Sequence, residues 1–176
     1  IAPAGRRGLW IGTENFGLDY LDFGGSSFRH YRSDPMNPAS LNSASVWSVH
    51  EDAAGTLWVG TFTGGVNVST PNSGAIRHYH AVPGDPASLG FNTVRAFAES
   101  RPGAYWVATD GGGLNEFDAS TGRFAHYTTH TSNLNSDAVL DVVQDHEGTT
   151  WLGSWEGGVS RFDRATRSFT AFTSKN

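Results

Sequence analysis

The chain carries one short apolar block four times along its length. Each block begins with a glycine, continues through consecutive apolar residues that include a tryptophan, and is followed by threonine or serine. The four tryptophans are Trp10, Trp58, Trp106 and Trp151, and they are spaced 48, 48 and 45 residues apart. A fixed period in the forties is typical of propellers and solenoids, so we expect a repeat architecture.

Three more runs accompany each block in the complete repeats. A valine-led run precedes it, and two runs follow it, the last of which ends in an aromatic residue. In the second repeat they cover 46–52, 65–68 and 76–79. All are rich in valine, threonine and aromatic residues and are bounded by glycine, aspartate, asparagine or serine, which are strand signals. With no helical periodicity, the pattern predicts an all-β fold with four strands per repeat.

The apolar block also indicates how the repeats pack. Successive side chains of a strand point to opposite faces of its sheet, yet Leu57, Trp58 and Val59 are all apolar. Both faces must therefore be covered. A β-propeller meets this requirement because each four-stranded blade lies between two neighbouring blades.

The repeats set the expected boundaries. We read residues 1–7 as a linker remnant and 8–176 as a partial β-propeller domain. Its repeats cover 8–31, 46–79, 94–127 and 139–172. The first repeat shows no valine-led run, so its blade is expected to lack the first strand. This phasing favours a piece of a larger ring, and a closed ring of four blades is the alternative.

An incomplete ring has a physical consequence. Propellers remove their sheet edges by closing on themselves, and an open arc leaves the outer faces of its end blades uncovered. Those faces would carry apolar residues, which favour association. We therefore expect either an unusually small ring or self-association through the exposed end blades.

The long connections between repeats share one residue type. Leu41, Leu89 and Leu134 each precede by five residues the valine that opens the next first strand. Proline, aspartate and serine surround the leucines and shape turns. We interpret each leucine as an anchor that docks its loop onto the fold.

Composition and charge exclude several classes of protein. The net charge is −5 without a basic cluster, which argues against nucleic acid and anionic membrane surfaces as partners. No apolar run reaches the 18 residues of a membrane span, so we expect no membrane contact. The chain has no cysteine, and this is compatible with both oxidising and reducing compartments.

The repeat unit resembles the two-component regulator propeller repeat. The resemblance extends over residues 8–172, and the second repeat carries it most fully, in Val46, Val49, Asp52, Gly55, Leu57, Trp58, Val59, Gly60, Thr61, Gly64, Gly65, Val66 and Tyr79. In that family the repeats form seven-bladed propellers in the periplasmic sensor regions of hybrid histidine kinases and membrane-bound diguanylate cyclases. The resemblance implies a non-catalytic, ligand-sensing role in the periplasm, with carbohydrate fragments as frequent ligands.

The sequence gives no pattern for catalysis, a metal or a cofactor. His30, His78 and His126 occupy equivalent positions of successive repeats, which lie too far apart in a propeller to share one ion. The repeated aspartates Asp52 and Asp145 are interpreted as turn residues, as are Asp118 and Asp163. The glycine pairs precede no helix, so they are not phosphate-binding loops. We expect no enzyme activity.

Positions that differ between repeats are the better candidates for recognition. They lie in the turn between the second and third strands and at the second position of the first strand. Aromatic faces combined with a few polar groups suit a sugar or a peptide. The candidate ligand-binding residues are Trp47, Phe62, Arg95, Asp110, Trp155 and Glu156.

Three functions follow from this pattern. The first is a ligand-sensing propeller that binds a small molecule, carbohydrate or peptide. The second is a scaffold whose blades bind a protein partner or copies of the chain. The third is a propeller lyase or glycosidase, which would require a convergent acid–base pair, and the sequence shows none. Ordinary variation of loop residues would also produce the differences between repeats.

Overall fold

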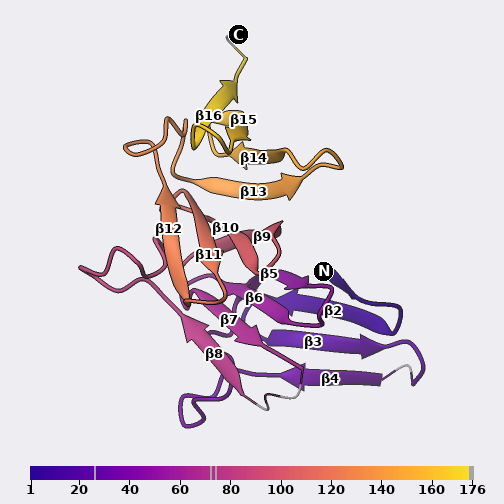
Figure 1. Ribbon diagram of the computed structural model, residues 1–176. Helices are drawn as coiled ribbons and strands as arrows, with labels where there is room; N and C mark the ends of the chain where they lie inside the picture. The colour runs from indigo at the N-terminus through magenta and orange to yellow at the C-terminus, as the bar shows by residue number, and fades with distance from the viewer. Residues whose placement is uncertain (26, 72, 74, 175–176) are drawn as a thin grey trace. The chain divides into compact units, whose positions relative to one another are not determined.

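The computed structural model describes residues 1–25, 27–71, 73 and 75–174 of the chain. These residues form sixteen β-strands in four separate sheets, and within each sheet the strands follow chain order (Figure 1). We call each sheet a blade. The expected four-stranded antiparallel repeats are confirmed. The described residues include no helix, and so none that is long and apolar enough to cross a membrane.

The chain divides into two compact units of two blades each. Unit 1 comprises residues 1–80 and 92–94. Its first blade consists of β1 (Ala2–Ala4), β2 (Gly8–Thr13), β3 (Gly17–Asp22) and β4 (Ser27–Tyr31). Its second blade consists of β5 (Val46–Glu51), β6 (Leu57–Thr61), β7 (Val66–Ser69) and β8 (Ile76–Tyr79).

The first blade corrects one expectation. Residues 1–7 are not a linker, because β1 pairs antiparallel with β2, with Ala2 opposite Trp10 and Ala4 opposite Gly8. Ala2 and Ala4 are both buried, as alternate residues on one face of a strand. The strand escaped sequence reasoning because it is short and contains alanine and proline, which have low β propensity. The first blade is therefore complete.

Unit 2 comprises residues 81–91 and 95–176. It contains the third blade of the chain, which is built from β9 (Val94–Arg101), β10 (Ala104–Thr109), β11 (Leu114–Asp118) and β12 (Arg123–Tyr127). It also contains the fourth blade, which is built from β13 (Val139–Gln144), β14 (Thr150–Ser154), β15 (Gly158–Asp163) and β16 (Ser168–Phe172).

Aromatic rings fill the interface between the two blades of unit 2. The indole of Trp106 is fully buried, with its centroid 5.1 Å from the ring of Phe162 on the fourth blade. Tyr127 lies 5.2 Å from the same ring, and Phe169 completes the cluster at 5.0 Å from Phe162. The edge-on angles between Trp106, Tyr127 and Phe162 are those that aromatic rings prefer. Trp106 Nε1 donates to Thr150 Oγ1 at 3.1 Å, so its polar atom is satisfied.

The long connections are fastened as predicted. Leu41, Leu89 and Leu134 are each at most 3% exposed, which confirms them as anchors. In unit 1 the imidazole of His78 hydrogen-bonds the carbonyl oxygen of Ser40 at 2.9 Å. In unit 2 His126 contacts the carbonyl of Ser88 in the same way at 2.7 Å. The loops that end at Leu41 and Leu89 are thus each held at the base by a buried leucine and a histidine.

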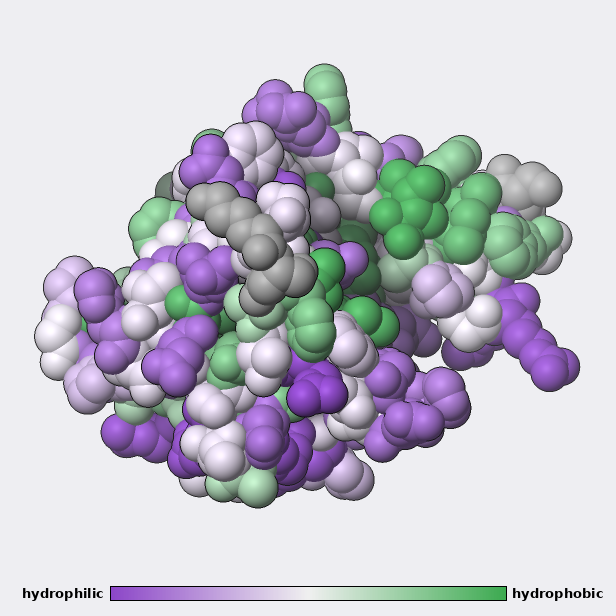
Figure 2. All heavy atoms as spheres, turned by 90° about the horizontal axis from the view of Figure 1, so that it is seen from above, coloured by the Kyte–Doolittle hydropathy of each residue, from purple (hydrophilic) through white to green (hydrophobic). Residues whose placement is uncertain are grey.

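A serine hydroxyl closes each of these two loops. Ser40 Oγ accepts from the backbone N–H of Asp34 at 2.9 Å and donates to the carbonyl oxygen of the same residue at 3.0 Å. Ser88 Oγ accepts from the N–H of Val82 at 2.9 Å. The residues between the two ends of each loop, such as Met36, project into solvent. Hydrophobic side chains also reach the surface elsewhere, and Figure 2 shows them (green) gathered in groups among hydrophilic residues (purple).

Candidate ligand-binding site

The turns between the second and third strands of the first three blades share one hydrogen-bond pattern. Thr13, Thr61 and Thr109 each donate their hydroxyl to the carbonyl oxygen of the glycine four residues later, at 2.8–3.0 Å. The accepting glycines have φ between 70° and 79°, a conformation that glycine adopts without strain. The threonine and the glycine therefore fix each turn, and the residues between them are free to differ.

In unit 1 this turn end presents two aromatic rings. Trp47 is the extra residue of a β-bulge, because Val46 pairs with Thr61 and Ser48 with Gly60. A bulge can re-aim a side chain, and the Trp47 ring lies 4.6 Å from that of Phe62, centroid to centroid, at an interplanar angle of 34°. Both remain accessible, with 38% of Trp47 and 44% of Phe62 exposed.

The backbone beneath this aromatic pair is fixed on both sides. The N–H of Phe62 donates to the carbonyl of Ser45 at 3.0 Å. Its carbonyl oxygen accepts from the hydroxyl of Thr93 at 2.6 Å. Trp47 and Phe62 therefore form a pre-organised, partly exposed platform, which lowers the entropy lost on binding a flat ligand face.

In unit 2 the equivalent turns meet at the segment that precedes β13. Asp110 forms an isolated antiparallel bridge with Ala138, and the N–H of Trp155 donates to the carbonyl of Ala138 at 2.9 Å. Trp155 is 64% exposed. Glu156 has φ of 57°, which is unusual for a residue with a side chain and is a form of local strain.

Five of the six candidate residues are thus placed in two groups. Trp47 and Phe62 are in ring contact in unit 1. Asp110 and Trp155 share Ala138 as a backbone partner in unit 2, with Glu156 next in the chain. Arg95 is half-buried at the second position of β9. Their role in binding stays a prediction.

The repeated aspartates act as turn residues. Asp145 Oδ1 accepts from the N–H groups of Glu147 and Thr149, and Oδ2 accepts from the indole N–H of Trp151 at 2.8 Å. The hydrogen bond from Trp151, followed by that from Thr149, holds the pKa of the Asp145 carboxyl below its usual value. Such a carboxylate is already satisfied in the fold. Within the described part of the chain, no cluster of three or more histidine or acidic residues could hold a metal.

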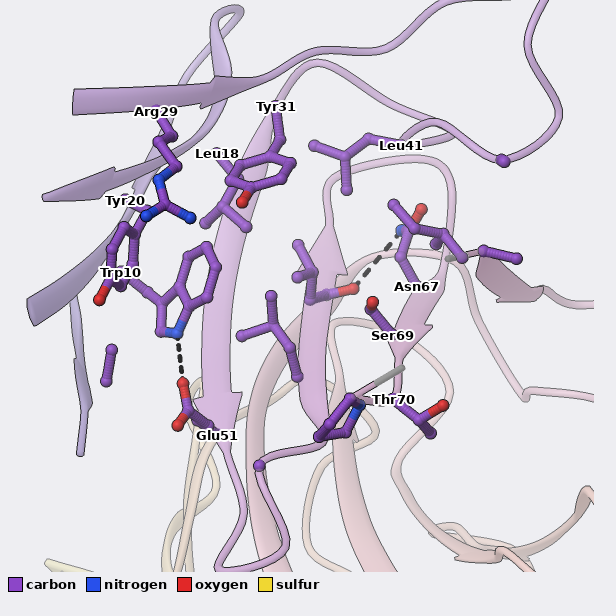
Figure 3. A pocket seen from close by; sticks show the side chains of 18 of the residues that line it. Trp10, Leu18, Tyr20, Arg29, Tyr31, Leu41, Glu51, Asn67, Ser69 and Thr70 are labelled. Carbon is purple, nitrogen blue, oxygen red and sulfur yellow. Dashed lines mark hydrogen bonds between the residues drawn. The ribbon is translucent and has the colours of Figure 1, made fainter. Parts of the chain in front are cut away.

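Sequence reasoning missed a cavity of about 620 Å³ in unit 1, between the first and second blades. Trp10, Tyr20 and Tyr31 lie on one wall, and Ser69 and Thr70 on the opposite wall (Figure 3). Trp10 Nε1 donates to the carboxylate of Glu51 at 2.5 Å (Figure 3). This volume is in the range of small-molecule sites.

One small side chain in the wall of this cavity stands at a position where the other blades carry a larger one. Ser69 pairs with Leu57 and Ile76, just as Phe162 pairs with Thr150 and Phe169 in the fourth blade. Eleven residues after each repeat tryptophan stand Leu21, Ser69, Phe117 and Phe162. The serine at this otherwise apolar position is the sequence signal that could have revealed the cavity.

Comparison with known proteins supports the fold and the repeat. Residues 40–63 match the family model described as the two component regulator propeller, which confirms the resemblance in the second repeat. The whole chain superposes on part of the extracellular domain of a protein from B. thetaiotaomicron described as a hybrid two-component system, at 25% identity and a TM-score of 0.86. No curated protein sequence matches the chain.

Two other solved structures share the fold. The extracellular domain of a B. thetaiotaomicron protein described as a one-component system matches 94% of the chain at 22% identity, with a TM-score of 0.76. Virginiamycin B lyase from Staphylococcus aureus matches 97% of the chain and 53% of its own length at 14% identity, with a TM-score of 0.71. The β-propeller fold is thereby confirmed. The chain spans 24% and 23% of the two B. thetaiotaomicron domains.

Proposed function

Since residues 40–63 match the two-component regulator propeller model, we propose that this chain is a ligand-sensing propeller segment of a membrane-bound signalling protein. The protein is a hybrid histidine kinase or a diguanylate cyclase, and the segment lies in the periplasm. The extracellular position of the B. thetaiotaomicron domains that share its fold supports this proposal. The segment recognises its ligand without chemical conversion.

The exposed pair of Trp47 and Phe62 is the observation that carries this proposal. The two rings are in contact with one another, and a bulge and two backbone hydrogen bonds hold this part of the chain in place. Exposed aromatic faces next to polar turn residues can bind the apolar face of a sugar ring or a peptide side chain. A carbohydrate or a peptide is therefore the expected ligand class.

Binding by variants tests this function. A panel of oligosaccharides and peptides is screened with the purified chain by thermal shift and then by calorimetry. Trp47→Ala and Phe62→Ala should each weaken binding of a positive ligand at least tenfold, the loss typical of an aromatic hot-spot residue. The control is Phe23→Ala, which removes an equally exposed ring from the turn between β3 and β4. Equal affinity in all three variants would refute the site.

A second function, self-association, rests on the exposed face of the fourth blade. Val159 occupies the repeat position of Leu18, Val66 and Leu114, which are at most 1% exposed, yet 45% of Val159 is exposed. Phe172, at the position of the buried Tyr127, is also 45% exposed. This face matches in chemistry the faces that blades bury against one another, so a second copy of the chain is its proposed partner.

Sedimentation velocity tests the association. The chain should sediment as a dimer or larger species at tens of micromolar, and Val159→Asp with Phe172→Ser should return it to a monomer. The control is Phe23→Ser, on a different surface of the chain. A wild-type chain that remains monomeric at high concentration would overturn this second function without affecting the first.

A further inference from the structure

We propose that the cavity between the first and second blades binds an arylalkylamine, a small molecule with an aromatic ring and a protonated amine. This site is separate from the turn residues of the proposed sensing function. Glu51, which lines the cavity, is the last residue of β5, whereas Trp47 is the second residue of the same strand. The two sites therefore lie at opposite ends of β5.

Unit 2 shows which chemical groups the space can hold. In the corresponding interface the rings of Phe162 and Phe169 pack against Trp106 and Tyr127. The guanidinium of Arg164 lies 5.7 Å from the centroid of the Trp106 ring, a cation–π contact. An aromatic ring and a nearby cation are thus what the fold itself places beside this tryptophan.

Unit 1 lacks each of these groups while keeping their surroundings. Ser69 and Ile76 stand at the positions of Phe162 and Phe169, and Pro71 stands at the position of Arg164. Trp10 and Tyr31, which correspond to Trp106 and Tyr127, are retained. Tyr31 is 37% exposed where Tyr127 is 4% exposed, so the aromatic wall of unit 1 is open to an added ring.

The carboxylate of Glu51 supplies the partner for the amine. It accepts the indole N–H of Trp10 at 2.5 Å, and within the described part of the chain it forms no ion pair. The other acidic wall residue, Asp22, is already 3.7 Å from Arg29, whose guanidinium lies 5.5 Å from the Tyr20 ring centroid. A partly buried carboxylate beside an aromatic face is a favourable site for a cation.

Part of the cavity wall suits an aromatic ring. Leu18, Leu57, Val59 and Ile76 line it, whereas Arg7, Arg29, Asp22 and Glu51 supply its charged groups. The amide of Asn67 is already used, since it donates to Asn42 Oδ1 at 2.8 Å and accepts from the N–H of Asn42 at 3.0 Å.

The test uses phenethylamine as the probe, titrated into the chain by calorimetry and by NMR of the Trp10 indole N–H. Binding with a shift of that resonance supports the proposal. The matched probe 3-phenylpropionate, which carries a negative charge on a similar skeleton, should bind at least tenfold more weakly. Equal binding of the two probes, or no binding of phenethylamine, would overturn it.

Three variants locate the binding. Ser69→Phe restores the ring that fills this space in unit 2 and should abolish binding. Glu51→Gln keeps an acceptor for the Trp10 indole, and the fourth blade carries Gln144 at the equivalent position. This variant should weaken binding about tenfold, because it removes one charge-assisted hydrogen bond. Ser69→Ala keeps the cavity and should bind like the parent chain. Unchanged binding in Ser69→Phe and Glu51→Gln would place the probe elsewhere and refute the site.

Discussion

The two compact units repeat the same eight-strand arrangement but treat the space between their blades differently. In unit 2 the side chains of Trp106, Tyr127, Phe162 and Phe169 form a buried cluster in the interface. In unit 1 a cavity of about 620 Å³ occupies the corresponding region, beside a smaller core that includes Leu18, Leu41, Val46 and Val59. The comparison teaches that a repeat fold can keep its strand arrangement while substitutions at a few equivalent positions, among them Ser69 and Phe162, change the packing between its blades.

The largest expected effect comes from removing the buried indole of unit 2. Trp106→Ala should lower the free energy of unfolding by about 3–5 kcal/mol, because it leaves a cavity among Tyr127 and Phe162. Trp10→Ala, at the same repeat position but beside an existing cavity, should cost clearly less. Denaturant unfolding measures both. Equal losses would contradict the contrast between the units.

Creating the cavity in the filled unit is the next test. Phe162→Ser should destabilise the chain by about 3–4 kcal/mol, since it removes a buried ring that contacts three other aromatic rings. Phe28→Ser removes a 53% exposed ring on β4 and serves as the control. If Phe162→Ser behaved like the control, the aromatic cluster would not be the main source of stability in this interface.

Filling the cavity in unit 1 should change the free energy of unfolding in the opposite direction. Ser69→Phe is expected to raise the free energy of unfolding by about 1 kcal/mol, a typical gain from filling a cavity. Thermal or denaturant unfolding measures the gain, with Ser69→Ala as the control for loss of the hydroxyl. A destabilised Ser69→Phe would mean that the walls of unit 1 do not accommodate the ring as those of unit 2 do.

The smallest expected effect is a change in stability that is seen only at acidic pH. The carboxyl of Asp145 has its pKa lowered from 3.8, first by the hydrogen bond from Trp151. A lowered pKa in the folded state means that the stabilising contribution is complete above 3.8 and is lost as the pH falls through the folded value. Asp145→Asn should therefore make stability less sensitive to pH below 4. Unfolding curves between pH 2 and 6 measure this, and an unchanged acid slope would contradict it.

Much of the fold follows directly from the sequence. The tryptophan period, the apolar runs and the anchoring leucines Leu41, Leu89 and Leu134 predict the blades and their connections, because these features depend on local periodicity and burial. Strand β1 was missed because Ala2 and Ala4 become buried only by pairing with β2. This strand depends on tertiary pairing, and the β propensities of its residues do not predict it.

The binding surfaces were predictable only in part. The variable turn residues were found from differences between repeats, but the contact of Trp47 with Phe62 depends on a bulge that no composition rule identifies. The cavity depends on a comparison across blades, since Ser69 is ordinary in its own strand and matters only opposite Trp10 and Tyr31. The packing between blades therefore cannot be predicted from the sequence of one repeat alone, whereas the strand pairing within a blade can.

The loop bases offer a practical use for engineering. Residues 35–39 stand between the closing bonds of Asp34 and Ser40, and His78 and Leu41 fasten the base of the loop. Extra residues inserted there would lengthen a solvent-exposed tip, at an entropic cost that grows only slowly with length. A fluorophore or a short affinity peptide grafted at Met36 would thus give a reporter that leaves the sheets on either side undisturbed.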